Sequence, residues 1–335
     1  MKRIFSLIII VMFLISMLVA PGVQAKDEVS PQVLGVPFTV DSASGGYQIP
    51  KGSTINNLGN GDIVVTGPNG DTIFKTNDSL TEMVSTPDGW VKASHVYHVP
   101  SDSSVITEKN TIKVFFKDEL LLQIIDKEIS DVSSRAVKAV SPWMEYAEAY
   151  IGNLDFYTGV WTVPSSPPAP GSSAYDYLFN AIQIPNCILQ PVLEWNYGGS
   201  RSWTIAAWYG IYGYYVRATN PKTASPGNVI RGTMAWDTNR WYISIINNST
   251  GQYSNLYCYN LLVTSGMSAY CTLEGGNITK NGDVPGDTTF SSLSLRYNTN
   301  PITPSWAAKY NIPPGVTGMF VQIISSSSIK LNTAN

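Results

Sequence analysis

The sequence predicts an all-β protein whose larger part is an antiparallel β-sandwich. Short apolar runs alternate with turn residues along the chain, and no segment keeps a 3.6-residue apolar period over about ten residues. Charged residues make up only 13% of the chain, against roughly 25% in an ordinary soluble protein. Serine, threonine, asparagine, glycine and tyrosine take their place, which is typical of β-rich extracellular domains with many turns.

The N-terminal residues have the pattern of a secretion signal. Lys2 and Arg3 precede an apolar run over residues 4–20, and Val23-Gln-Ala25 offers small residues suited to a signal peptidase. We therefore expect residues 1–25 to be a signal peptide and residues 26–35 a linker. The protein would be secreted, or tethered to the cell surface if the segment stays uncleaved. No later segment reaches the about 18 consecutive apolar residues of a spanning helix, so we expect no membrane insertion beyond the signal.

Residues 36–126 are predicted to form a small, separate N-terminal β domain. Its short apolar runs are separated by three turn signals, Asn60-Gly61, Pro68-Asn-Gly70 and Pro87-Asp-Gly89. Residues 127–141 are more polar and mix both charges, so we place a linker there.

Residues 142–335 are predicted to form the sandwich. Eight of the nine tryptophans lie in this region, and its short strand-like runs are separated by turn residues. The expected strands span residues 157–163, 177–182, 187–195, 203–208, 241–246, 256–263, 268–273, 290–297 and 318–324.

Charge and histidine content exclude several classes of function. The net charge is −3 without a basic cluster, which makes nucleic acid a poor partner. The only two histidines, His95 and His98, both precede the sandwich region and point to opposite faces of a strand. The sandwich therefore has no Ser-His-Asp triad, Cys-His pair or histidine zinc site of its own. We expect no cofactor and no metal.

The three cysteines leave two interpretations open. Cys258 and Cys271 lie symmetrically about Thr264-Ser-Gly266, as two strands of one hairpin would place them. A cross-strand disulfide between them is one interpretation for an oxidising compartment, and Cys187 is then the odd thiol. The other interpretation is three buried, unpaired cysteines.

Carboxylates and amides remain as the chemical groups of the sandwich region. In the run from Cys187 to Trp195, strand alternation places Gln190 and Glu194 on one face. A carboxylate can activate water, and an amide can donate to a developing oxyanion. Four residues of strand span roughly 13 Å, so we expect the partner of Gln190 to come from a neighbouring strand.

Between about Trp161 and Leu273 the sequence resembles the eqolisins, or glutamic peptidases. The segments that carry the resemblance are Trp161-Thr-Val-Pro164, Phe179-Asn-Ala-Ile182, Cys187-Ile-Leu-Gln190, Trp208-Tyr209, Pro226-Gly-Asn-Val-Ile230, Asn247-Asn-Ser-Thr-Gly-Gln252 and Ala269-Tyr-Cys-Thr-Leu-Glu274. The resemblance implies a concanavalin A-like two-sheet sandwich and peptide hydrolysis by a Gln–Glu dyad. It also implies synthesis as a precursor, which makes residues 36–126 a candidate pro-segment.

By this resemblance, the family's catalytic glutamate falls on Ile246, which can neither hold a proton nor activate water. Glu274 and Glu194 are the remaining acids that could face Gln190, with Glu274 preferred because a different strand supplies it. The resemblance also places Phe179 and Gln183 where the family has a tryptophan and an aspartate beside its glutamine strand.

Two functions therefore stay open for the face that carries Gln190. The first is a secreted glutamic-type endopeptidase that acts on extended polypeptide at acidic pH, with Gln190, Glu274 and Glu194 as catalytic candidates. The second is a non-catalytic module that binds glycan or peptide on the same face, which Ile246 favours. Both require Gln190 to face an open groove. The expected substrate-binding residues are Phe179, Gln183, Trp195, Trp208 and Tyr209.

Overall fold

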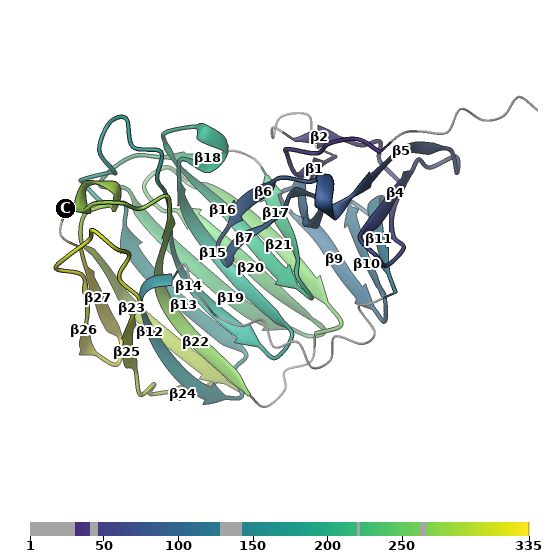
Figure 1. The fold of residues 1–335 in the computed structure, drawn as a ribbon. Coiled ribbons are helices and arrows are strands. Elements are labelled where there is room, and N and C mark those ends of the chain that lie inside the picture. Colours follow the sequence, from purple (N-terminus) through teal and green to yellow (C-terminus); the bar gives the residue numbers. More distant parts are fainter. Residues whose placement is uncertain (1–30, 41–45, 128–142, 220–221, 262–265, 334) are drawn as a thin grey trace, which may run out of the picture.

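In a computed structural model of the chain, two large β-sheets pack face to face (Figure 1). The structure describes residues 31–40, 46–127, 143–219, 222–261, 266–333 and 335. The predicted signal peptide and most of the predicted linkers lie outside these residues. Within them, no helix is long and apolar enough to cross a membrane.

One sheet, called the site sheet below, has 11 strands within the described residues, in the order β2-β1-β8-β17-β16-β15-β14-β22-β12-β25, with β18 beside β16. Its strands are β1 (Phe38–Thr39), β2 (Tyr47–Gln48), β8 (Val96–Pro100), β12 (Trp143–Gly152), β14 (Tyr175–Ile184), β15 (Cys187–Trp195), β16 (Trp203–Ile211), β17 (Tyr214–Thr219), β18 (Lys222–Ala224), β22 (Met267–Gly276) and β25 (Ala307–Tyr310).

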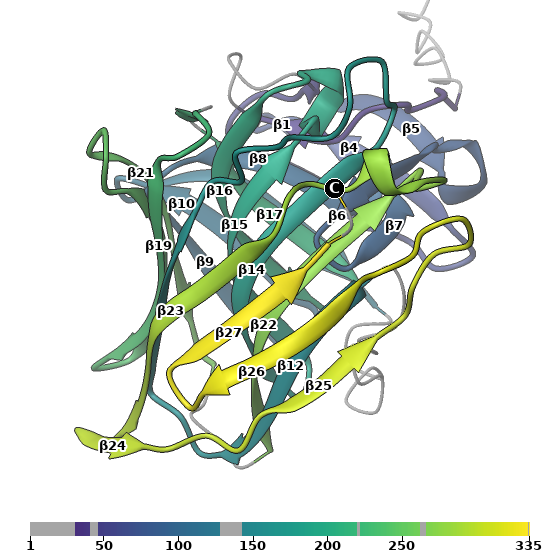
Figure 2. The same cartoon turned by 90° about the vertical axis from the view of Figure 1, so that its left-hand side faces the viewer.

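The other sheet, called the back sheet, has 14 strands in the described part of the chain, in the order β26-β27-β23-β13-β19-β20-β21-β9-β10-β11-β3-β4-β5, with β24 beside β23. Its strands are β3 (Ser53–Asn57), β4 (Asp62–Thr66), β5 (Thr72–Asn77), β9 (Ser103–Glu108), β10 (Thr111–Phe116), β11 (Glu119–Asp126), β13 (Phe156–Thr162), β19 (Val229–Asp237), β20 (Arg240–Asn247), β21 (Gln252–Tyr259), β23 (Thr288–Tyr297), β24 (Asn300–Ile302), β26 (Phe320–Ser325) and β27 (Ser328–Asn332). Figure 2 shows the hairpin β26–β27 at one end of the sandwich, next to β25.

A hairpin of two strands belongs to neither large sheet. It consists of β6 (Met83–Thr86) and β7 (Gly89–Lys92), and it lies in front of the site sheet in Figure 1. The described residues also include four 3₁₀ turns, η1 (Asp78–Leu80), η2 (Ala93–His95), η4 (Tyr197–Gly199) and η5 (Asn281–Asp283). The first two of these turns connect the hairpin to its neighbours along the chain.

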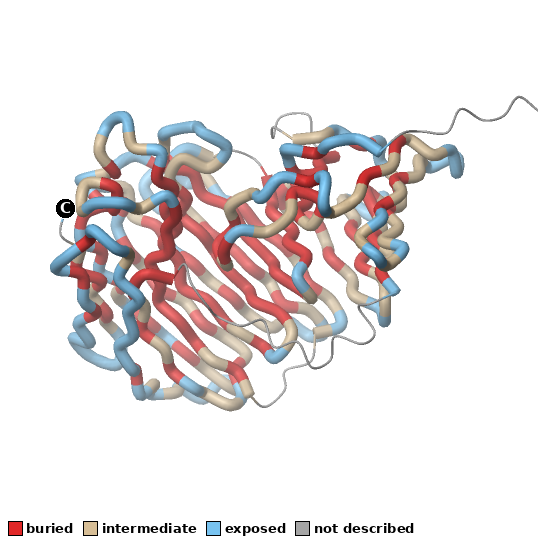
Figure 3. Tube along the Cα trace, in the orientation of Figure 1, coloured by how far each residue is buried: buried red, intermediate tan, exposed pale blue. Residues whose placement is uncertain are grey.

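The space between the two sheets is the main hydrophobic core (Figure 3). Alternate residues of the long central strands point into it, as the period of two in a pleated strand requires. Its largest fully buried side chains include Trp161, Trp241, Tyr157, Tyr209 and Phe290. Every strand pair between β12 and β27 is antiparallel, which confirms the predicted antiparallel sandwich.

We predicted a separate N-terminal domain. Apart from β6 and β7, the N-terminal strands are instead part of the two sheets of this sandwich. Strand β8 pairs in parallel with β17 in the site sheet, and β9 pairs in parallel with β21 in the back sheet. Both sheets therefore continue from the C-terminal region into residues 36–126. Parallel pairs need long connections, so local sequence carries no hairpin signal for these two joins.

The predicted disulfide between Cys258 and Cys271 is wrong. The two cysteines lie on β21 and β22, which belong to different sheets and do not form a hairpin. Cys187, Cys258 and Cys271 are all buried free thiols, and the hydroxyl of Tyr157 lies 3.1 Å from the sulfur of Cys271. Burial raises the pKa of Cys187 and of Cys271 to about 12, which keeps these thiols protonated.

We expect the folded protein to resist thiol-modifying reagents at mildly alkaline pH, because buried, protonated thiols are poor nucleophiles. After unfolding in urea without reductant, all three cysteines should react. Mass spectrometry after alkylation measures both states, and fewer than three modified cysteines in the unfolded chain would contradict the placement.

Candidate functional site

The outer face of the site sheet carries the two groups with the right chemistry. Gln190 on β15 and Glu274 on β22 both point away from the main core, and β14 lies between their strands. Both side chains are fully buried. The ladder between β14 and β15 skips Gln190 and Pro191, because Pro191 has no N–H to donate. The predicted placement of Gln190 and Glu194 on one face is therefore confirmed, and Glu274 shares it.

The tip of the β6–β7 hairpin covers both groups. The Gln190 amide nitrogen donates to the carbonyl oxygen of Pro87 at 2.5 Å. The Gly89 N–H donates to Glu274 Oε1 at 3.0 Å. One residue, Asp88, separates these two backbone groups, so the amide and the carboxyl converge on a single short stretch of polypeptide.

Each of the two side chains keeps one polar atom without a hydrogen-bond partner among the described residues, Gln190 Oε1 and Glu274 Oε2. Burial, and then the neighbouring Asp88 carboxyl, raise the pKa of Glu274 well above its usual range. Glu274 is therefore held as a neutral acid while the hairpin covers it.

Asp88 is a second acid at the same place. Its carboxyl accepts a hydrogen bond of 2.6 Å from the hydroxyl of Tyr215 on β17. Burial raises the pKa of Asp88 to about 7, and the bond from Tyr215 opposes this shift only in part. Two carboxyl groups with raised pKa values thus meet under the hairpin, one from the hairpin and one from the sheet.

Glu194, the other acid predicted for the site, is fully committed to an ion pair. Arg217 donates to both of its oxygens, at 2.9 and 2.6 Å. Trp208 donates its indole N–H at 2.6 Å and Thr204 its hydroxyl at 2.9 Å. The ring of Tyr197 lies over the guanidinium of Arg217, whose Cζ atom is 4.1 Å from the ring centroid. Glu194 is thus a buried structural carboxylate that accepts from four donor groups.

The predicted substrate-binding residues divide between two faces. Phe179 and Trp208 lie in the aromatic cluster under the hairpin. Gln183 lies on the same strand as Phe179, where its side chain accepts a hydrogen bond from Tyr270 at 3.2 Å. Trp195 and Tyr209 face the main core, Trp195 against Trp203 and Tyr209 fully buried. Trp195 and Tyr209 therefore lie on the opposite face of the site sheet from Phe179, Gln183 and Trp208.

Ile246 lies in the back sheet, on β20, so it does not line the groove that holds Gln190. Its neighbours Ile245 and Asn247 are buried, whereas Ile246 is half-buried and faces outward. Our interpretation of an acid lost beside Gln190 therefore finds no support in the geometry. The acid that reaches the hairpin tip held by Gln190 is Glu274.

Sequence reasoning missed the residues that contact the candidate dyad from the hairpin. Pro87-Asp-Gly89 was recognised as a turn signal, but nothing in it indicates what the turn touches. The positive φ of Gly89, 108°, explains why glycine follows Asp88 at the tip.

Two hollows of the surface differ in their relation to this site. One of about 460 Å³ lies beside the hairpin and is lined in part by Trp90, Tyr175, His98 and Tyr197, but not by Gln190 or Glu274. Among the described residues, no cluster of three His, Cys, Asp or Glu side chains is placed to hold a metal ion.

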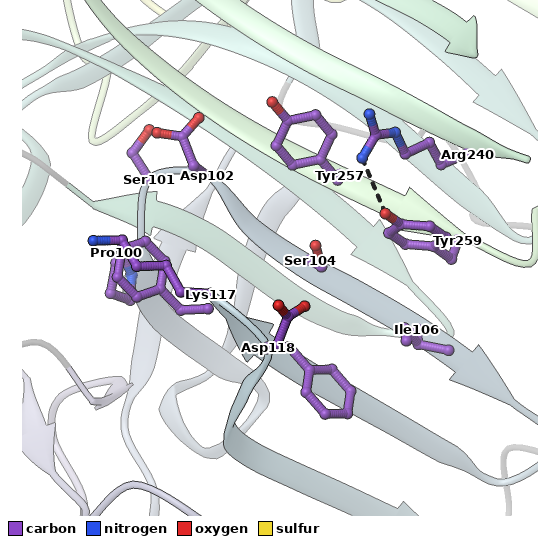
Figure 4. Close-up of a pocket in the computed structure, with 12 residues that line it drawn as sticks. Pro100, Ser101, Asp102, Ser104, Ile106, Lys117, Asp118, Arg240, Tyr257 and Tyr259 are labelled. Carbon is purple, nitrogen blue, oxygen red and sulfur yellow. Dashed lines mark hydrogen bonds between the residues drawn. The ribbon is translucent and has the colours of Figure 1, made fainter. Parts of the chain in front are cut away.

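A larger hollow of about 930 Å³ lies over the back sheet, where β20 and β21 meet β9 and β10 (Figure 4). There the guanidinium of Arg240 lies 4.5 Å from the ring centroid of Tyr257 and donates to the hydroxyl of Tyr259 at 3.0 Å. None of the predicted site residues lines it, so it is distinct from the Gln190 site.

We expect Arg217→Met to lower the free energy of unfolding by about 3–5 kcal/mol, because it leaves Glu194 as a buried charge without its cation. The exposed Arg231→Met serves as the control and should change it by less than about 0.5 kcal/mol. Adding Glu194→Gln to Arg217→Met should recover part of the loss. Urea unfolding monitored by tryptophan fluorescence measures all three, and equal stabilities of the two arginine variants would show that the pair is not structural.

A scan against protein-family models and a search of curated proteins each found no match for this chain. Among solved structures, scytalido-glutamic peptidase with a transition-state analogue inhibitor is 17% identical, with a TM-score of 0.43 over 58% of this chain and 100% of that chain. SCP-B, a member of the eqolisin family in complex with the tripeptide Ala-Ile-His, is 19% identical, with a TM-score of 0.41 over 57% of this chain and 98% of that chain. Aspergilloglutamic peptidase from Aspergillus niger is 18% identical, with a TM-score of 0.34 over 48% of this chain and 99% of that chain. The function proposed below therefore rests on the geometry of Gln190, Glu274 and the hairpin.

Proposed function

We propose that the chain is a secreted precursor of a glutamic-type endopeptidase, with Gln190 and Glu274 as its catalytic dyad. One observation supports this proposal above all others. The two side chains already hold a piece of polypeptide, with the amide on a backbone carbonyl and the carboxyl on an N–H two residues later. A substrate chain in the same position would offer the same backbone groups.

The chemistry follows from the two groups. With the groove open, Glu274 takes a proton from a water molecule, whose oxygen attacks the carbonyl carbon of the substrate peptide bond. Gln190 donates its amide N–H to the carbonyl oxygen, where negative charge develops. Glu274 then returns the proton to the leaving amine as the C–N bond breaks, which yields a new carboxyl and a new amino terminus.

This cycle needs a carboxyl that both loses and regains a proton at the working pH. The usual range of a hydrated glutamic acid lies at acidic pH, and Glu274 becomes hydrated when the hairpin leaves. We therefore place the activity in acidic surroundings, on polypeptides that are extended or unfolded.

The groove is not open in this structure, contrary to our expectation. Pro87 and Gly89 are buried against the dyad, so neither a substrate nor a glycan reaches Gln190 while the hairpin is in place. The proposal therefore applies to the chain after the hairpin has moved, which agrees with synthesis as a precursor.

The glycan-binding alternative gains no support from the aromatic residues. Trp208 uses its indole N–H on Glu194, and Phe179 and Tyr215 pack in the cluster under the hairpin. These rings form a second core rather than an exposed platform. The non-catalytic alternative was favoured by Ile246, which lies in the other sheet.

We expect Gln190→Ala to lower hydrolysis of a denatured protein at mildly acidic pH by about 10²–10³-fold, because one oxyanion donor is lost. Glu274→Gln should lower it by about 10²–10⁴-fold, because no group remains to move the proton. Release of new amino termini from denatured casein measures both, with protein whose hairpin has been excised as described below.

The exposed residues Gln322 and Glu119 supply matched controls, Gln322→Ala and Glu119→Gln, which should keep full activity. Activity that survives both dyad variants, or that is absent from the excised protein at every pH between mildly acidic and neutral, would overturn the assignment.

A further inference from the structure

The β6–β7 hairpin is held against the site sheet by side-chain and tip contacts, without pairing to either large sheet. Beyond its tip, the hydroxyl of Ser85 is hydrogen-bonded to the hydroxyl of Tyr177 on β14. The ring of Trp90 packs edge-on against Tyr175, with 5.1 Å between ring centroids. Trp90 remains 45% exposed, so this packing is shallow. The hairpin can therefore leave without breaking a ladder of either sheet.

The strands that follow the hairpin are attached in a different way. Strand β8 is paired with β17 over five residues, and Val96, Tyr97 and Val99 are fully buried. Strand β9 continues the back sheet beside β21. Removal of these strands would expose the edges of β17 and β21 and open the main core, which a folded sandwich resists.

We propose that residues 83–92 are the plug of the Gln190–Glu274 site, and that displacement of this hairpin alone, with β8 and β9 left in both sheets, opens the groove. This proposal rests on the function proposed above and adds its regulation. It divides the N-terminal region into a mobile inhibitor and a permanent extension of the sandwich.

The plug carries its own acid, which makes its release dependent on pH. The titratable groups that face Asp88 are Tyr215 from β17 and Glu274 from β22, and Gln190 from β15 is neutral. The pKa of Asp88 is about 7 in the closed state and returns toward 3.8 when the hairpin is hydrated. A group whose pKa is raised in the closed state stabilises closure fully below its free value and loses that contribution as pH rises through the closed value.

The equilibrium constant for closure should therefore fall by up to about tenfold per pH unit between about pH 4 and pH 7. Glu274 acts in the same direction, because burial and Asp88 both raise its pKa. Acid thus favours the closed hairpin and neutral pH loosens it, so the intact chain is inhibited most strongly at the acidic pH at which the excised chain should be active.

Hydrogen exchange of the Gly89 amide in the full-length protein tests the proposal without any need for activity. The protection factor of this amide, which donates to Glu274, should fall at least about tenfold from pH 4.5 to pH 7.5. The Leu193 amide of β15 should keep its protection. Asp88→Asn, which stays neutral at every pH, should make the fall smaller, and the part that Glu274 contributes should remain. Asp71→Asn, in an exposed turn, should behave as wild type.

A Gly89 protection factor that does not change with pH, or that falls together with that of Leu193, would show that the hairpin is a fixed part of the fold. The same conclusion follows if Asp88→Asn and Asp71→Asn behave alike.

A shortened chain separates the plug from the chemistry. Met83 and Lys92 are cross-strand partners at the open end of the hairpin, so Asn-Gly can replace residues 84–91 as a two-residue turn. If the excised chain hydrolyses denatured casein at least about tenfold faster than the intact chain, both proposals hold. Equal non-zero rates overturn the plug. No hydrolysis by the excised chain, together with the expected exchange behaviour, leaves the plug and overturns the peptidase.

Gly89→Pro provides a second route if the excised chain does not fold. Proline lacks the N–H that Glu274 accepts and cannot adopt the φ of 108° found at this position, so the tip should open while the chain keeps its length. Exchange at Trp90 should then rise to the level of an exposed turn at pH 4.5, and retained protection there would overturn the proposal.

Discussion

A buried amide and a buried carboxyl need polar partners, and this requirement organises the outer face of the site sheet. The hairpin tip supplies one carbonyl to Gln190 and one N–H to Glu274. Each remaining polar atom, Gln190 Oε1 and Glu274 Oε2, has no partner among the described residues. An unsatisfied buried polar atom costs about 1–3 kcal/mol, so the closed state carries a penalty that hydration of an open groove removes. These two unpartnered atoms therefore favour partial opening of the hairpin.

The hairpin nevertheless stays closed because the strands that follow it in the chain are anchored in both sheets. Strands β8 and β9 extend both sheets through parallel pairs with β17 and β21, and η2 leads directly from the hairpin into β8. The tip is therefore kept at a high local concentration over Gln190 and Glu274. The same joins explain why the N-terminal region is not an independent unit. A short covalent tether makes even the shallow packing of Trp90 sufficient to hold the hairpin in place.

The sequence was enough to predict the all-β class, the antiparallel sandwich and the shared face of Gln190 and Glu194, because these follow from local periodicity. It was not enough for contacts between distant segments. Nothing near Pro87-Asp-Gly89 shows that this turn lies on Gln190, about a hundred residues later in the chain. The Cys258–Cys271 pairing failed for a related reason, since symmetry about a turn does not reveal that β21 and β22 enter different sheets. The order of segments likewise gave no indication that Ile246 and Gln190 lie in different sheets.

Glu194 and Glu274 show how surroundings decide the role of a carboxyl. Both lie on the outer face of the site sheet, and both are register partners of Tyr177, one on each side of β14. Glu194 meets Arg217, Trp208 and Thr204, so both of its oxygens are occupied by donors from the protein. Glu274 meets the Gly89 N–H, the Trp143 indole and the Asp88 carboxyl, and burial holds it neutral. A group that must lose and regain a proton needs the second environment, and Glu274 combines it with a contact to the hairpin tip that also holds the Gln190 amide.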